Sequence, residues 1–184
     1  NLDIEPGPSV TIVSSGGGSD LYFQKLDPSG NFIWGDGIGG TSTDYVESIT
    51  ADAFDNVYVS GFFQTTVDFD PGVGTNNLTA NSGLDGFTLA LNSTKNFLWV
   101  SPLLGSGTEV VTEVAVGGAG ELYLASRIGG TVDVDPSATV LNYTTNGLAD
   151  IVITKLSDCV PVAPTPDLVT LADINGECSV SSPT

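Results

Sequence analysis

The chain contains no histidine, and only four of its 184 residues are lysine or arginine. Without histidine it can form neither a Ser-His-Asp triad nor a Cys-His pair, and zinc and most other transition metals lose a common ligand. Twenty-two acidic residues leave a formal net charge of −18. Nucleic acids and anionic membranes bind clustered basic residues, so we expect neither as a partner.

Long apolar stretches are also missing. No apolar run approaches the roughly 20 residues of a membrane helix, so we expect no membrane insertion. No window shows a 3.6-residue apolar period, which predicts essentially no helix. There is no methionine, even at position 1, and a repeat is already under way at Asn1. We therefore expect the chain to be a piece of a longer protein.

What the sequence does contain is a repeat of 65 residues. Asp20, Asp85 and Asp150 keep this spacing, "NFIW" at 31–34 returns as "NFLW" at 96–99, and "TVDFDP" at 66–71 returns as "TVDVDP" at 131–136. The same offset reaches back to "LDIEPG" at 2–7 and forward to "DIVITKL" at 150–156. A fixed period of this kind indicates stacked structural units. The chain holds two whole units, 20–84 and 85–149, with partial units at both ends.

Each unit is patterned as β-hairpins. Residues 21–26 and 32–35 flank the turn "DPSGN", where Asp-Pro opens the turn and glycine supplies a positive φ. Residues 46–52 and 56–63 form a second hairpin, and 66–79 contain a short third one. The predicted fold class is all-β, with tandem 65-residue antiparallel repeats. The 23 glycines of the chain and its 40% hydrophobic residues suit many short strands around a core.

The first two hairpins of a unit would supply the four strands of a propeller blade, with the third hairpin at the rim. A blade buries both faces against its neighbours. We expect the repeat region to be part of a β-propeller. An open stacked β-repeat array is the alternative, because a closed ring needs roughly four to eight blades.

Three segments follow from these patterns. Residues 1–156 form the repeat region. Residues 157–166 carry three prolines and are expected to be an extended linker. Residues 167–184 are expected to begin a second β module. Cys159 and Cys178 are expected to pair across the linker, or else Cys178 pairs with a cysteine further along the protein.

The acid pair Asp68 and Asp70 raises the question of a site. Two residues apart on a strand, these side chains would share a face with their roots about 7 Å apart, near the separation used in glycoside hydrolysis. However, the pair recurs at Asp133 and Asp135 and, as Asp3 with Glu5, near the start. An active site is rarely copied into each repeat, so we expect no catalytic residues.

Calcium is the sharper hypothesis for these pairs, because hard cations bind several carboxylate and carbonyl oxygens. It assigns Asp68, Asp70, Asp133 and Asp135 as tentative Ca²⁺ ligands; no other cofactor is expected. The structural alternative places the acids on the wet face of a short strand, where they discourage edge pairing. Val67 and Phe69, like Leu2 with Ile4, then form the buried face, and Asp70 before a proline ends the strand.

Two further sets of residues recur with the period. The aspartates Asp20, Asp85 and Asp150 each precede a strand and are expected to cap turns by accepting backbone hydrogen bonds. Four aromatic residues could form a sugar-stacking platform, but their position on strands favours a core between sheets. They are Trp34, Trp99, Tyr58 and Tyr123.

The first unit resembles the bacterial β-propeller repeats known as SBBP repeats. The motifs that carry the resemblance are Asp20, "D-x-x-G-N-x-x-W" at 27–34, Gly39 with Gly40, and "D-x-x-x-N-V-Y-V-S-G" at 52–61. It covers residues 1–156, although the second unit has "NSTKN" and "GGAGE" at the corresponding turns. "TLADINGECSVSS" at 170–182 resembles the start of an Ig-like or HYR-type repeat of bacterial surface adhesins.

These resemblances imply a long, modular, secreted or cell-surface protein of the kind exported by a type IX system and used in adhesion or gliding. The implied partners are other modules of the same chain and surface glycans or proteins. We therefore expect a non-enzymatic, extracellular structural or adhesion segment. The alternative is a secreted propeller that binds glycans with calcium or acts on carbohydrates.

Overall fold

The computed structural model describes residues 1–136, 140–157 and 165–169, and every regular element in these ranges is a strand. These ranges therefore contain no helix that could cross a membrane. The strands are β1 (Leu2–Asp3), β2 (Ile12–Val13), β3 (Leu21–Leu26), β4 (Phe32–Ile38), β5 (Tyr45–Ala51), β6 (Val57–Phe63), β7 (Thr66–Asp68), β8 (Asn77–Thr79), β9 (Asp85–Leu91), β10 (Phe97–Leu103), β11 (Val110–Val116), β12 (Leu122–Ile128), β13 (Thr131–Asp133), β14 (Asn142–Thr144), β15 (Asp150–Ser157) and β16 (Thr165–Val169).

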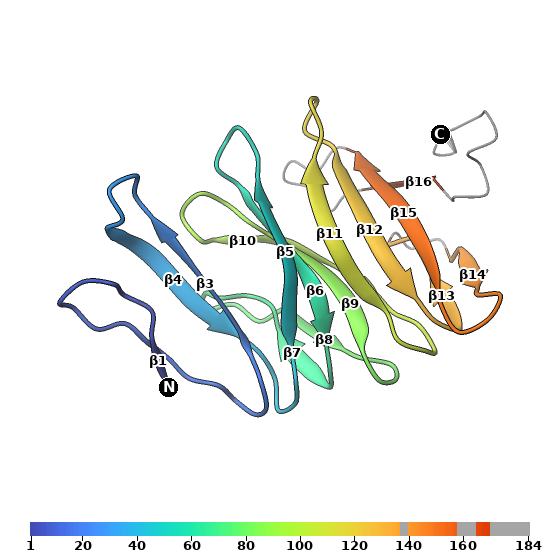
Figure 1. The fold of residues 1–184 in the computed structure, drawn as a ribbon, viewed down its shortest axis with the longest axis horizontal. Coiled ribbons are helices and arrows are strands. Elements are labelled where there is room, and N and C mark those ends of the chain that lie inside the picture. Colours follow the sequence, from blue (N-terminus) through green and yellow to red (C-terminus); the bar gives the residue numbers. More distant parts are fainter. Residues whose placement is uncertain (137–139, 158–164, 170–184) are drawn as a thin grey trace.

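The larger strands form three sheets that follow one another along the molecule (Figure 1). We call β3–β4 the first sheet, β10-β9-β6-β5 the middle sheet and β11-β12-β15-β16 the last sheet. All the pairings within them are antiparallel. The small hairpins β1–β2, β7–β8 and β13–β14 are separate two-stranded sheets, which we call the rim hairpins. The all-β, propeller-like repeat expected from the sequence is confirmed.

The boundaries of the sheets differ from the expected ones. The two hairpins of one sequence unit do not share a blade: β3–β4 stands apart, whereas β5–β6 pairs with β9–β10 of the next unit through β6 and β9. Each four-stranded sheet therefore joins the second hairpin of one unit to the first hairpin of the next. In chain order, the rim hairpin β7–β8 is inserted between the second and third strands of the middle sheet, and β13–β14 is inserted at the same point of the last sheet.

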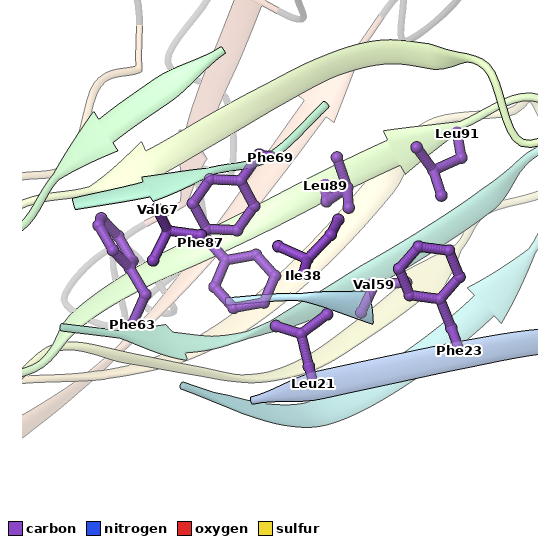
Figure 2. Packing of buried hydrophobic residues seen from close by; sticks show 10 residues of the cluster. All are labelled: Leu21, Phe23, Ile38, Val59, Phe63, Val67, Phe69, Phe87, Leu89 and Leu91. Atoms are coloured by element: carbon purple, nitrogen blue, oxygen red, sulfur yellow. The ribbon is translucent and has the colours of Figure 1, made fainter. Parts of the chain in front are cut away.

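Two apolar clusters hold successive sheets together. Between the first and middle sheets, Leu21, Phe23 and Ile38 pack with Val59, Phe87 and neighbours (Figure 2). Between the middle and last sheets, Tyr58, Ala90 and Trp99 pack with residues of β11, β12 and β15. Consequently β9, in the interior of the middle sheet, is buried along its whole length. Burial on both faces is what a sheet sandwiched between two others requires.

The hairpin turns follow the sequence prediction. In "DPSGN", Asp27 Oδ1 accepts the backbone N–H of Ser29 and of Asn31, both at 2.8 Å, and Gly30 has φ of 84°. The left-handed position is occupied by Asp55 and Lys95 in two later turns, with φ of 62° and 71°. These two residues tolerate a conformation that glycine adopts freely.

The end of the repeat region differs from the expected segmentation. Ser157 ends β15, and Thr165 and Pro166 of the expected linker lie in β16, which pairs with β15. Residues 167–169, expected to open a second module, complete this strand. It takes the place in the last sheet that β10 takes in the middle sheet, so the sheet reaches four strands. Cys159 and Cys178 lie outside the described residues, and their disulfide stays a prediction.

Candidate functional site

The rim hairpins carry the acid pairs and repeat a single design. In β7–β8, Val67 faces Leu78 and Asp68 faces Asn77; in β13–β14, Val132 faces Tyr143 and Asp133 faces Asn142. Each of these two hairpins also has a cross-strand threonine pair with hydroxyl oxygens 2.9 Å apart, Thr66 with Thr79 and Thr131 with Thr144. The threonines are exposed, so the same polar surface appears twice, one repeat apart.

The apolar residues of the motif anchor each rim hairpin, as expected. Val67 and Phe69 are buried, and Phe69 lies against Phe63 and Phe87 with ring centroids 5.4 and 4.8 Å apart (Figure 2). Val132 and Val134 are buried in the same way. At the N-terminal copy Ile4 is buried, but Leu2 is exposed, contrary to expectation. There Leu2 is the first residue of β1, at the end of the strand, whereas Val67 and Val132 are each the middle residue of theirs.

The first acid of each pair closes the rim loop. Asp68 Oδ1 accepts the backbone N–H of Asp70 at 3.1 Å and of Asn76 at 2.7 Å. Asp133 Oδ1 accepts from Asp135 and Leu141 at 3.2 and 2.9 Å. Asp3 Oδ1 does the same with Glu5 and Thr11, both at 3.1 Å. A carboxylate that accepts two backbone donors across a loop defines the loop's shape.

The second acid of the pair is also used locally. Asp70 Oδ1 accepts the N–H of Gly72 at 2.7 Å. A side chain at Gly74 would overlap the Asp70 carboxylate, so the loop wraps closely around that group. No group of three or more potential metal-ligating side chains occurs in the ranges that the structure describes. The structural role of Asp68, Asp70 and Asp133 is evident, and the Ca²⁺ assignment of Asp68, Asp70, Asp133 and Asp135 stays a prediction.

A second acidic feature lies between the sheets. Asp85 opens β9 in the middle sheet, and Glu109 immediately precedes β11 in the last sheet; both are fully buried. Asn81 N–H donates to Asp85 Oδ2, and Gly105 N–H donates to Asp85 Oδ1 at 2.9 Å. Gly129 N–H donates to Glu109 Oε1 at 3.3 Å. Oxygen Oε2 of Glu109 is buried and accepts no hydrogen bond from the described residues.

The same arrangement occurs one repeat earlier. Asp20 precedes β3 and Asp44 precedes β5, and these two residues correspond by the 65-residue offset to Asp85 and Glu109. Gly16 N–H donates to Asp20 Oδ2. Asp44 is buried and accepts from Gly40 at 2.8 Å and from Gln64 at 2.9 Å. We call Asp20 with Asp44, and Asp85 with Glu109, the inter-sheet acid pairs.

One acid of each inter-sheet pair, Asp44 or Glu109, has a raised pKa. Burial raises the pKa of Glu109 from 4.5 to about 7, and its side-chain hydrogen bond with Asp85 adds to the shift. Burial also raises the pKa of Asp44, opposed by its backbone hydrogen bonds with Gln64 and Gly40. A buried carboxyl near a second acid favours the neutral form. The middle–last interface therefore contains an acid that titrates near neutral pH.

The capping role expected of Asp20, Asp85 and Asp150 is confirmed, because each accepts a backbone N–H from four residues earlier. The partners of Asp20 and Asp85, which are Asp44 and Glu109, were not predicted from the sequence. The signal that could have found them is an acid at equivalent positions of the two units, although one is Asp and the other is Glu.

The periodic aromatic residues have divided roles. Trp99 and Tyr58 are buried in contact, with ring centroids 6.1 Å apart. Trp34 is partly buried, and its Nε1–H donates to Ser93 O at 3.1 Å. Tyr123 was expected in the core but is exposed, because it lies on the outer face of the last sheet. A shallow groove lined by Phe23, Trp34 and Ile49 remains between the first and middle sheets.

Comparisons with known proteins give one relative that bears on the fold. The chain is 32% identical over 117 residues to an uncharacterized WD repeat-containing protein of Acanthamoeba polyphaga mimivirus, a match covering 59% of this chain and 8% of that protein. WD repeats form β-propellers, which agrees with the stacked four-stranded sheets. No family model matches the chain, and no solved structure matches it. The chain thus spans a small part of the relative's length and is similar to it as a β-propeller-type repeat.

Proposed function

We propose that this chain is a non-catalytic interaction scaffold within a large, modular, extracellular protein, where it contributes to adhesion. The observation that carries the proposal is the regular copying of the rim hairpin. Thr66 with Thr79 and Thr131 with Thr144 place identical exposed hydroxyl pairs on successive copies. Stacked repeats of this kind provide extended binding surfaces, since each unit presents the same face at a regular interval.

Two further observations support a scaffold. The similarity to a WD repeat-containing protein suggests protein interaction as the use of the repeat. The carboxylates of the rim, including Asp68 and Asp133, are occupied by backbone N–H groups and shape the loops. A net charge of −18 suits an extracellular protein that must stay soluble, and it supports the proposed location.

The location is tested on intact cells that produce the protein. Proteinase K added outside the cells should degrade the repeat region, while a cytoplasmic marker survives. Degradation only after lysis would refute the extracellular assignment. This result would not affect the scaffold proposal, which is tested separately.

The scaffold proposal is tested with fluorescently labelled chain and the same cells. We expect saturable binding, and we expect Thr66→Arg with Thr131→Arg on the rim to weaken it strongly. The matched control is Phe54→Arg with Ala119→Arg, which adds the same charge one repeat apart on exposed turns away from the rim. Equal binding by the rim variant and the control would contradict the rim as the binding surface.

The second candidate function is calcium-dependent glycan binding. It is favoured by the groove that Trp34, Phe23 and Ile49 line, because aromatic and apolar side chains can stack against sugar rings. Calorimetric titration with CaCl₂ should then show saturable binding that is lost in the double variant Asp68→Asn and Asp70→Asn. Glycan binding should also be abolished by EDTA. No heat of binding and no effect of the chelator would remove this candidate.

A further inference from the structure

The pair of Asp85 and Glu109 lies at a mechanical junction between two sheets. Glu109 N–H donates to Leu84 O at 2.8 Å, so the backbone leading into β11 is tied to the backbone leading into β9. Asp85 belongs to the middle sheet and Glu109 leads into the last sheet, and their side chains are hydrogen-bonded to each other across this junction. Any repulsion between them acts directly on the docking of the last sheet.

The surroundings of the pair contain hydrogen-bond donors but no cation. Its contacts are backbone N–H groups, among them those of Asn81, Gly105 and Gly129. All four basic residues of the chain are placed elsewhere. Lys25, Lys95 and Lys155 pair with Asp55, Asp36 and Glu121, and Arg127 is exposed on the outer face of the last sheet.

These contacts indicate that the acid pair holds a proton and not a metal ion. A cation requires oxygen ligands, and the donors around the pair point N–H groups at the carboxylates instead. A proton satisfies the geometry, because a protonated Glu109 can donate to Asp85. The oxygen Oε2 of Glu109 is buried and accepts no hydrogen bond from the described residues, so without a proton on the pair it would carry unpaired negative charge. An unpaired buried charge of this kind is costly.

We propose that one proton shared by Asp85 and Glu109 locks the last sheet onto the middle sheet, and that its loss loosens this interface. Asp85 is the charged side chain that faces Glu109, and no basic group compensates the pair. The interface is therefore a pH-responsive contact built into the repeat. It holds in mildly acidic surroundings and opens more readily above neutral pH.

The earlier acid pair is a natural comparison. Asp44 is one methylene shorter than Glu109, and both of its oxygens accept backbone N–H groups, from Gly40 and Gln64. Asp20 faces it with one buried oxygen, Oδ1, that accepts no hydrogen bond. Because Asp44 is satisfied by the backbone, the contact between the first and middle sheets should depend less on pH.

The test is amide hydrogen exchange of the whole chain by mass spectrometry, with protection factors corrected for the intrinsic pH dependence. Protection of β11 should fall about tenfold per pH unit from pH 5 to 7 and then level off, because opening releases one proton. Peptides covering β3 should show a weaker dependence. A pH-independent protection factor for β11 in the wild-type chain would overturn the proposal.

Two variants assign the effect. Glu109→Gln keeps the size of the side chain and can donate to Asp85, so it should abolish the decline in β11 protection. Asp44→Asn, the matched change in the first pair, should leave that decline intact. An unchanged decline in Glu109→Gln would refute the assignment to this pair. The wild-type profile remains decisive if either variant fails to fold.

Discussion

Replacing Glu109 by glutamine should make the protein more stable at alkaline pH, although the substitution removes a native side chain. The pKa of Glu109 is raised from 4.5 to about 7 in the folded state. The folded protein therefore holds this proton more tightly than the unfolded chain does. Its stabilising contribution is complete below pH 4.5, declines as pH rises and is lost above pH 7.

The size of the effect follows from the shift. Each pKa unit corresponds to about 1.36 kcal/mol, so the shift between 4.5 and about 7 changes the free energy of unfolding by about 3 kcal/mol. Glutamine does not titrate, and it preserves both the contact with Asp85 and an acceptor for Gly129. The two proteins should have similar stability near pH 4.5, whereas at pH 8 the variant should be more stable by about 3 kcal/mol.

The assay is urea unfolding of both proteins at a series of pH values, followed by circular dichroism. Taking the difference between the two proteins cancels the titration of the acids that do not contact Glu109, which behave alike in both. The result that would refute the reasoning is a constant difference in unfolding free energy across the series. That result would mean that the pKa of Glu109 is the same in the folded and unfolded states, despite the burial of its side chain.

Three further substitutions test the packing and the rim. Phe69→Ala removes a fully buried ring and should destabilise the protein by about 3–5 kcal/mol in urea unfolding, whereas Val73→Ala on the exposed rim loop should change little. Gly61→Ala would push a methyl group into the Tyr45 carbonyl oxygen and should cost about 1–3 kcal/mol, measured as a lower melting temperature. Asp68→Ala should cost about 1–3 kcal/mol because it leaves two loop N–H groups unpaired, and Asp68→Asn should cost less in the same thermal melt; equal losses would contradict the hydrogen-bonding role.

The sequence was informative where structure depends on neighbouring residues. The turn at Asp27 and the rim loop at Asp70 are set by contacts within a few positions, and their residue types indicate them directly. The strand β7 itself ends at Asp68, two residues before the end that was predicted at Asp70. The aspartate caps were predictable for the same reason. The inward direction of Val67 and Phe69 followed from alternation along a strand, since successive side chains point to opposite faces.

Which hairpins share a sheet could not be predicted in this way, and we call this assignment the phase of the sheets. The residues of β6 pair with those of β9 across an inserted rim hairpin, and a hairpin pattern is the same whichever neighbour it joins. The pairing of β16 with β15 was missed for a related reason. The prolines Pro161, Pro164 and Pro166 indicated an extended linker, but an extended segment can also become an edge strand, where proline is tolerated.

The shifted phase explains why the inter-sheet acid pairs occur where they do. Asp20 and Asp44 belong to one sequence unit, as do Asp85 and Glu109, yet the hairpins that each pair precedes lie in different sheets. One unit therefore supplies half of two successive sheets, and its acid pair lies where those halves diverge. Separating the sheets pulls apart the two hairpins of a single unit. A proton held at that point controls the contact between successive sheets, and this contact makes the repeat a continuous stack. The first unit has Asp44 at this position and the second has Glu109, and this difference makes the contact between the middle and last sheets more sensitive to pH than the contact between the first and middle sheets.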